Sequence, residues 1–134
     1  MYHVLLVDDE ASVTDSLRCS IDWGKYDLEV AAAVPNGERA LDVIRQQPID
    51  IVITDIRMAK TGGLELCQQI SSMNRNIQTI IMSGYAEFSY AQKAINYGVV
   101  GYCLKPVEYD EIIRHLVHAV QRLKATARLP DYDN

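Results

Sequence analysis

The stretch IVITDIR at residues 51–57 joins a run of Ile and Val to a carboxylate, Asp55. A second stretch of this kind, VLLVDDE at residues 4–10, runs into Asp8 and Asp9. Apolar runs like these are typical of parallel strands that helices cover on both faces. Because parallel strands end at the same edge of their sheet, we expect the acids to gather at that edge. Both stretches therefore predict an α/β fold with a polar site beyond the strand ends.

The rest of the chain repeats this arrangement of apolar runs and amphipathic stretches. Residues such as Ile112, Leu116 and Val120 recur every four positions and give the last amphipathic stretch one apolar face. Alternation of this type is expected of parallel strands joined by crossover helices. The expected strands are residues 2–7, 28–34, 49–54, 78–83 and 100–104.

Length and charge limit the classes of function. The chain has 134 residues, of which 49% are hydrophobic, and this fits one domain. We expect that domain to cover residues 1–124 and residues 125–134 to be a tail or the start of a linker. The net charge is −5 with no block of Lys and Arg, which argues against nucleic-acid binding by this chain. No apolar stretch is long enough to span a membrane, so we expect a cytoplasmic protein without membrane contact.

The cysteines and histidines follow no metal-binding spacing. Cys19, Cys67 and Cys103 are far apart, so we interpret them as plain thiols. His115 and His118 lie three residues apart in the last expected helix and could share a metal. With no third ligand in sight in the sequence, we interpret them as solvated helix residues.

The acids predict a metal and a phosphate. If the first and third strands are neighbours, Asp8 and Asp9 lie beside Asp55, and carboxylates this close repel unless a cation joins them. Mg²⁺ suits such oxygen ligands and leaves positions for phosphoryl oxygens. Lys105 and Ser83, each at the end of an expected strand, could contact the same phosphoryl group. The alternative is that the acids and Ser83 merely cap helices and that Lys105 is an exposed loop residue.

In this order and spacing, the sequence resembles CheY-like receiver domains of two-component response regulators over residues 2–124. The resemblance implies a flavodoxin-like α/β fold with a five-stranded parallel sheet in the order 2-1-3-4-5. The motifs that carry it are the pair Asp8 and Asp9, Asp55 in TDIRM, Ser83 in MSGY, and Tyr102, Lys105 and Pro106 in GYCLKP.

The resemblance implies a phosphoacceptor role. Asp55 would take a phosphoryl group from a sensor histidine kinase, with Lys105 neutralising charge. Mg²⁺ would be held by Asp9, Asp55 and the backbone carbonyl of Arg57, with Asp8 close by or acting through water. Such a domain catalyses its own phosphorylation and slow dephosphorylation and is not a turnover enzyme.

The resemblance also implies a conformational switch. Ser83 would move to bond the phosphoryl group, and Tyr102 would then turn inward and change the surface formed by the fourth helix, the fifth strand and the fifth helix. Arg57 and Tyr85 would help to set the rate of phosphoryl loss. The peptide bond before Pro106 would be cis, as is usual in the family.

The loop after Asp55 departs from the family pattern, with Ala59 where Pro is usual and Gly62 where Asp is usual. Residues 83–106 resemble receivers joined to AraC-type helix-turn-helix domains, which implies DNA binding and transcription control through an output domain outside this chain. Two copies could also pair on activation. The alternative function is an interaction or dimerisation module with the receiver fold that works without phosphorylation.

Overall fold

The computed structural model describes residues 1–58, 61–73, 75–84 and 88–128. Its centre is a five-stranded parallel sheet with the order β2-β1-β3-β4-β5. This confirms the predicted α/β fold and strand order. The strands are β1 (Tyr2–Val7), β2 (Leu28–Val34), β3 (Ile51–Asp55), β4 (Gln78–Ser83) and β5 (Gly101–Leu104).

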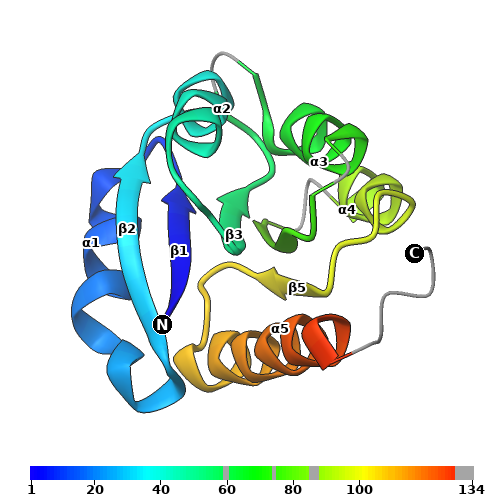
Figure 1. The fold of residues 1–134 in the computed structure, drawn as a ribbon. Helices are drawn as coiled ribbons and strands as arrows, with labels where there is room; N and C mark the ends of the chain where they lie inside the picture. Colours follow the sequence, from blue (N-terminus) through cyan, green and yellow to red (C-terminus); the bar gives the residue numbers. More distant parts are fainter. Residues whose placement is uncertain (59–60, 74, 85–87, 129–134) are drawn as a thin grey trace.

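Helices cover both faces of the sheet, as Figure 1 shows. One layer contains α1 (Ala11–Ser20) and α5 (Tyr109–Arg128). The other contains α2 (Gly37–Gln46), α3 (Gly63–Ser72) and α4 (Phe88–Ile95). Each helix follows one strand and precedes the next, except α5, which ends the fold. This is the crossover arrangement expected from the alternating sequence pattern.

Alternate residues of β1 divide the core between the two faces of the sheet. Val4 and Leu6 pack in the cluster under α1 and α5, whereas Leu5 and Val7 pack in the cluster under α2 and α3. All four side chains are fully buried. Because successive side chains of a strand point to opposite faces, only a continuous apolar run can fill both clusters.

Two details differ from the sequence-based expectation. The last helix continues to Arg128, past the boundary expected near residue 124. A short 3-10 helix, η1 (Trp23–Tyr26), lies in the connection after α1, where the alternating sequence pattern predicts no element. Its Trp23 side chain is buried and donates a hydrogen bond to the Arg18 carbonyl at 3.1 Å. The indole therefore closes the end of the core under α1.

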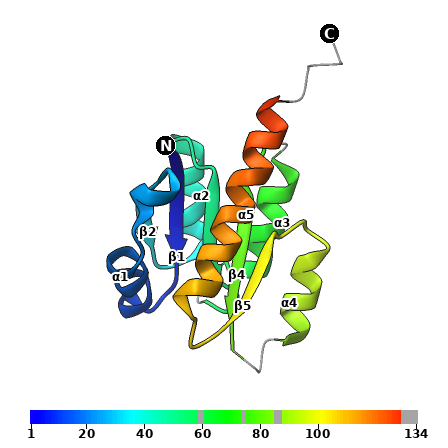
Figure 2. The same cartoon turned by 90° about the horizontal axis from the view of Figure 1, so that it is seen from below.

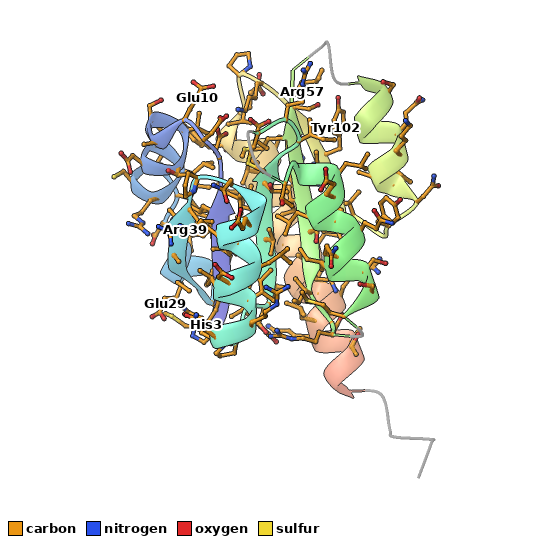
Figure 3. The ribbon with its side chains drawn as sticks, turned by 90° about the horizontal axis from the view of Figure 1, so that it is seen from above. His3, Glu10, Glu29, Arg39, Arg57 and Tyr102 are labelled. Carbon is orange, nitrogen blue, oxygen red and sulfur yellow. The ribbon has the colours of Figure 1, made fainter. Side chains whose placement is uncertain are left out.

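The strand ends define the two ends of the molecule. Figure 3 shows Glu10, Arg57 and Tyr102 at one end, and His3 and Glu29 at the other. Glu10 and Arg57 come after the last residues of β1 and β3, so their end is the carboxyl edge of the sheet. Within the described parts of the chain, no helix has both the length and the apolar character needed to cross a membrane.

Candidate functional site

A lysine joins two carboxylates at the carboxyl edge of the sheet. Asp8 follows β1 and Asp55 ends β3, and these strands are neighbours with Val7 opposite Thr54. The Lys105 Nζ atom lies 2.8 Å from Asp8 Oδ2 and 3.1 Å from Asp55 Oδ2. Side chains from the ends of β1, β3 and β5 thus converge at the place where the strand order reverses, as the sequence predicts.

These three groups are shielded from water to different degrees. The Asp8 side chain is 0% exposed, that of Asp55 is 11% exposed and that of Lys105 is 22% exposed. Burial raises the pKa of Asp55, and nearby Asp8 adds to the rise against the opposing effect of Lys105. Burial lowers the pKa of Lys105, but bonds and charges from Asp8 and Asp55 outweigh it, so its pKa is raised. Lys105 therefore stays an ammonium and offsets part of the excess negative charge.

The backbone around Asp55 fixes its carboxylate. The Ile56 N–H donates to Asp55 Oδ1 at 2.8 Å, so one oxygen is held by the backbone and the other by Lys105. The α3 helix begins directly against this segment: a Cβ at Gly63 would lie 2.2 Å from the Asp55 carbonyl oxygen. Nothing in the sequence indicates this close contact between Gly63 and Asp55.

Hard oxygen ligands gather in the turn that follows β1. Carboxylate oxygens of Asp8, Asp9 and Glu10 lie within 4.8 Å of one another. The Asp8 Oδ1 atom accepts a hydrogen bond from the Glu10 N–H at 2.9 Å, so Asp8 also organises the turn into α1. Asp9 and Glu10 are exposed. Oxygen ligands that reach solvent in this way suit a hard divalent cation such as Mg²⁺.

An open pocket of about 510 Å³ borders this cluster. It extends from Asp9 to Arg57, whose side chain is exposed. The other residues that line it are Ile56, Met58, Gly62, Leu64 and Glu65. The pocket is thus bordered by Asp9 and by Ile56 and Arg57, the two residues that follow Asp55 in the chain.

Ser83 and Tyr102 contact each other on the neighbouring strands β4 and β5. The buried Ser83 hydroxyl donates to the Tyr102 hydroxyl at 3.1 Å, and the Tyr102 side chain is half-buried. The Lys105 N–H donates to the Ser83 carbonyl at 2.7 Å, which connects this pair to the lysine. The Tyr102 hydroxyl thus contacts Ser83 directly in this structure.

The remaining predicted residues either lie close to the site or fall outside the residues that the structure describes. The Lys105–Pro106 peptide bond is cis, as the resemblance implies. Gly62 is the N-cap residue of α3, with extended backbone geometry. Tyr85 and Ala59 lie outside the described residues.

The parallel sheet in this order, with acids and a lysine at its reversal point, is the arrangement of receiver domains. Residues 4–117 match the response regulator receiver domain family. The chain belongs to this family, and the family resemblance found in the sequence is confirmed.

Regulators of transcription are among its relatives. The chain is 37% identical over 124 residues to the uncharacterized transcriptional regulatory protein YesN of Bacillus subtilis, covering 92% of this chain and 34% of that protein. It is 35% identical over 112 residues to the transcriptional regulatory protein HptR of Staphylococcus aureus, covering 84% and 44%. The chain thus spans less than half the length of these two relatives.

Solved structures of similar proteins have the same fold and come from regulators of the AraC-type group. The REC domain of AraT, a response regulator from Geobacillus stearothermophilus, is 33% identical with a TM-score of 0.88, covering 95% of this chain and 98% of that one. A two component transcriptional regulator AraC from Clostridium phytofermentans is 27% identical with a TM-score of 0.88, covering 96% and 100%. The predicted similarity to receivers of the AraC-type group is therefore confirmed.

Proposed function

We propose that this receiver domain accepts a phosphoryl group on Asp55 from a sensor histidine kinase. The observation that carries the proposal is the Lys105 ammonium, which lies within 3.1 Å of both Asp8 and Asp55. An Asp55 oxygen would form a bond to phosphorus as the nitrogen–phosphorus bond of the kinase phosphohistidine breaks. An ionised carboxylate is a competent nucleophile for this step and needs no general base.

The residues around Asp55 fit a bound Mg²⁺. Asp9, Asp55 and the Arg57 carbonyl would hold the ion, with Asp8 close by or acting through water, since the ligands present are oxygens. When bound, Mg²⁺ would withdraw charge from the transferring phosphoryl oxygens. Lys105 would pair with a phosphoryl oxygen in place of Asp55. The domain would in this way promote its own modification without being a turnover enzyme.

Two further side chains would set how long the phosphoryl group lasts. Arg57, which is exposed beside the pocket, and Tyr85 occupy the positions two beyond the acceptor and two beyond Ser83. Bulky groups there would restrict the approach of water to the acyl phosphate, so we expect slow hydrolysis.

The output would be a change in the surface formed by α4, β5 and α5. Ser83 now donates to Tyr102, and a phosphoryl oxygen on Asp55 would compete for that hydroxyl. Tyr102 would then repack and shift the population of the two surface states. Apolar side chains already lie exposed on this surface: Ile95, Leu104, Tyr109 and Val117. We propose that this surface contacts a second copy or an output domain.

The relatives suggest what that output is. YesN and HptR are transcriptional regulatory proteins, and this chain covers less than half of each. We propose that a DNA-binding output domain accompanies this receiver in the whole protein and that the protein works in the cytoplasm, as response regulators usually do.

Mass spectrometry after incubation with acetyl phosphate and Mg²⁺ tests the proposal. We expect the mass to rise by one phosphoryl group in the wild-type chain and to stay unchanged in Asp55→Asn. Addition of a chelator should prevent the gain. An unmodified wild-type chain would favour the alternative, a receiver-fold module that works without phosphorylation.

A further inference from the structure

A second cluster of potential metal ligands lies between β5 and α5, on the face of the sheet that α1 and α5 cover. It contains Cys103 from β5 and Glu111 and His115 from α5. One ligand atom from each residue lies within 4.8 Å of the other two. Figure 2 shows α5 running alongside β4 and β5, which brings these distant parts of the sequence together. We propose that this cluster is a binding site for a Zn²⁺-like divalent metal.

The packing of His115 and its unpartnered nitrogen suit metal binding. Its ring packs directly over Gly101, where a Cβ would fall 2.4 Å from the imidazole Cγ. The His115 Nε2 atom is buried and has no hydrogen-bond partner among the described residues. A buried imidazole nitrogen that lacks a partner costs free energy, and a metal ion would satisfy it. The absence of a side chain at Gly101 thus permits the position of the His115 ring, and the His115 Nε2 atom remains available to bind a metal.

The distances are close to those of a tetrahedral site. His115 Nε2 lies 3.9 Å from Glu111 Oε1. Zinc bonds of about 2.0–2.3 Å to nitrogen, oxygen and sulfur place ligand pairs about 3.3–3.8 Å apart. Small side-chain rotations would therefore close the cluster around an ion. Glu111 and His115 are four residues apart on one face of α5, so they can rotate together toward Cys103.

The chemistry of the three ligands selects the kind of metal. A thiolate, a carboxylate and a neutral imidazole together carry the charge that balances a divalent cation. Sulfur and nitrogen ligands favour Zn²⁺ over Mg²⁺, and three protein ligands leave a fourth position for water. On binding, the Cys103 thiol would release its proton to solvent as the sulfur–metal bond forms. The ion would then join β5, which carries Tyr102, to α5.

This site is independent of the phosphoacceptor. The acidic cluster at Asp8, Asp9 and Glu10 offers only oxygen, whereas the second site offers sulfur and nitrogen. We had interpreted His115 and His118 as solvated because the sequence shows no third ligand. The fold supplies that ligand from β5 and uses His115, while His118 is exposed.

Metal titration of the metal-free chain tests the site. A Cys19→Ser background removes the exposed thiol, and excess Mg²⁺ occupies the acidic cluster. Calorimetry with Zn²⁺ should show one equivalent bound, and Co²⁺ should give the charge-transfer absorption of a cobalt–thiolate bond. Bound metal should also raise the melting temperature, because it binds the folded state.

Matched variants locate the ion. His115→Gln and Cys103→Ser should weaken Zn²⁺ binding by at least about tenfold, since even loss of a supporting partner can cost that much. His118→Gln is the control on the same helix and should bind normally, as should Asp55→Asn. Gly101→Ala should weaken binding by displacing the imidazole while all three ligands remain, which decides the matter if Cys103→Ser fails to fold.

Three results would overturn the site. The first is the absence of Zn²⁺ binding to the wild-type chain. The second is equal affinity in the wild type, His115→Gln and Gly101→Ala. The third is a Co²⁺ complex without thiolate absorption, which would mean surface binding only. Because no phosphodonor is present, none of these results bears on phosphorylation of Asp55.

Discussion

Asp55 carries a charge that the metal-free domain accommodates poorly. Burial and Asp8 raise its pKa in the folded state. A raised folded-state pKa contributes stability below the unfolded-state pKa, and this is lost as the pH rises through the folded-state value. At pH 7 the ionised side chain therefore lowers stability. We expect Asp55→Asn to increase the free energy of unfolding by about 1 kcal/mol in the presence of a chelator, measured by urea denaturation.

The pH dependence is the control for this effect. At a pH below the pKa of Asp55, the wild-type side chain is neutral as well, so the advantage of Asp55→Asn should shrink. An Asn variant less stable than the wild type at pH 7 would mean that the carboxylate is adequately compensated by Lys105.

Lys105 stabilises the folded domain, whereas the charge of Asp55 destabilises it. The reason is that Lys105 is the cation between two shielded carboxylates. In Lys105→Met, the Asp8 carboxylate, with a side chain that is 0% exposed, loses the ammonium 2.8 Å away. We expect the free energy of unfolding to fall by about 2 kcal/mol in chelator. Added Mg²⁺ should stabilise this variant more than the wild type, because the cation replaces the missing charge.

Lys124→Met removes an exposed lysine from α5 and serves as the matched control. It should change stability by less than about 0.5 kcal/mol. If both lysine variants behave alike, the contacts of Lys105 contribute nothing beyond those of a surface residue.

Individual site residues could be predicted from the sequence only where they stand at the ends of expected strands. Asp8, Asp55 and Lys105 each follow or end an apolar run, and parallel strands bring their ends together. The sequence could not show that one ammonium contacts both carboxylates, because that depends on side-chain geometry. Nor could it join Cys103 to His115, since neither is unusual until β5 and α5 pack together.

Between neighbouring strands, the Ser83–Tyr102 hydrogen bond links β4 to β5. Ser83 is 0% exposed, so Tyr102→Phe would leave its buried hydroxyl without this partner. We expect a loss of about 1 kcal/mol, and a coupling of about 0.5–1.5 kcal/mol in a double-mutant cycle with Ser83→Ala. Urea denaturation of the four proteins measures both quantities. Additive single effects would show that the two hydroxyls are energetically independent.

The close contact between β3 and α3 depends on Gly63. Its missing Cβ would lie 2.2 Å from the Asp55 carbonyl oxygen and 2.7 Å from the Ile56 Cα, and these backbone atoms cannot move aside separately. Gly63→Ala should therefore cost at least about 3 kcal/mol and slow phosphoryl uptake by displacing Asp55. Thermal denaturation and mass spectrometry would measure the two effects.

Gly24→Ala in η1 is the control, because its added Cβ would come no closer than 3.9 Å to a described atom. This variant should unfold and accept phosphoryl groups like the wild type. Equal behaviour of the two alanine variants would show that α3 can shift away from Asp55 at little cost.

Helices and strands could be predicted from the sequence where apolar residues recur in a clear pattern. The strands β1, β2 and β4 have the expected bounds, and each contains a run of consecutive apolar residues. Helix α5 continues to Arg128, past the expected domain boundary at residue 124, although residues 125–128 lack apolar periodicity. Helix η1 was missed because it depends on tertiary burial of Trp23.

Across the whole molecule, two buried thiols on opposite faces of the sheet make stability depend on alkaline pH. Burial raises the pKa of Cys67 from 9.0 to about 12. Burial, followed by the Glu111 carboxylate, raises the pKa of Cys103 to about 12 as well. Between pH 9 and 12 the unfolded chain has lost thiol protons that the folded chain retains. Their stabilising contribution is thus complete below pH 9 and is lost as the pH approaches 12.

Replacing one of the two thiols isolates this contribution. Each thiol should reduce the free energy of unfolding by up to about 1.4 kcal/mol per pH unit above pH 9. Cys67→Val, of similar size, should therefore show a shallower decline than the wild type in urea denaturation with chelator present. The difference at pH 7, where both thiols are protonated, gives the packing cost alone. Parallel curves up to pH 10.5 would mean that Cys67 ionises as readily in the folded chain as in the unfolded chain.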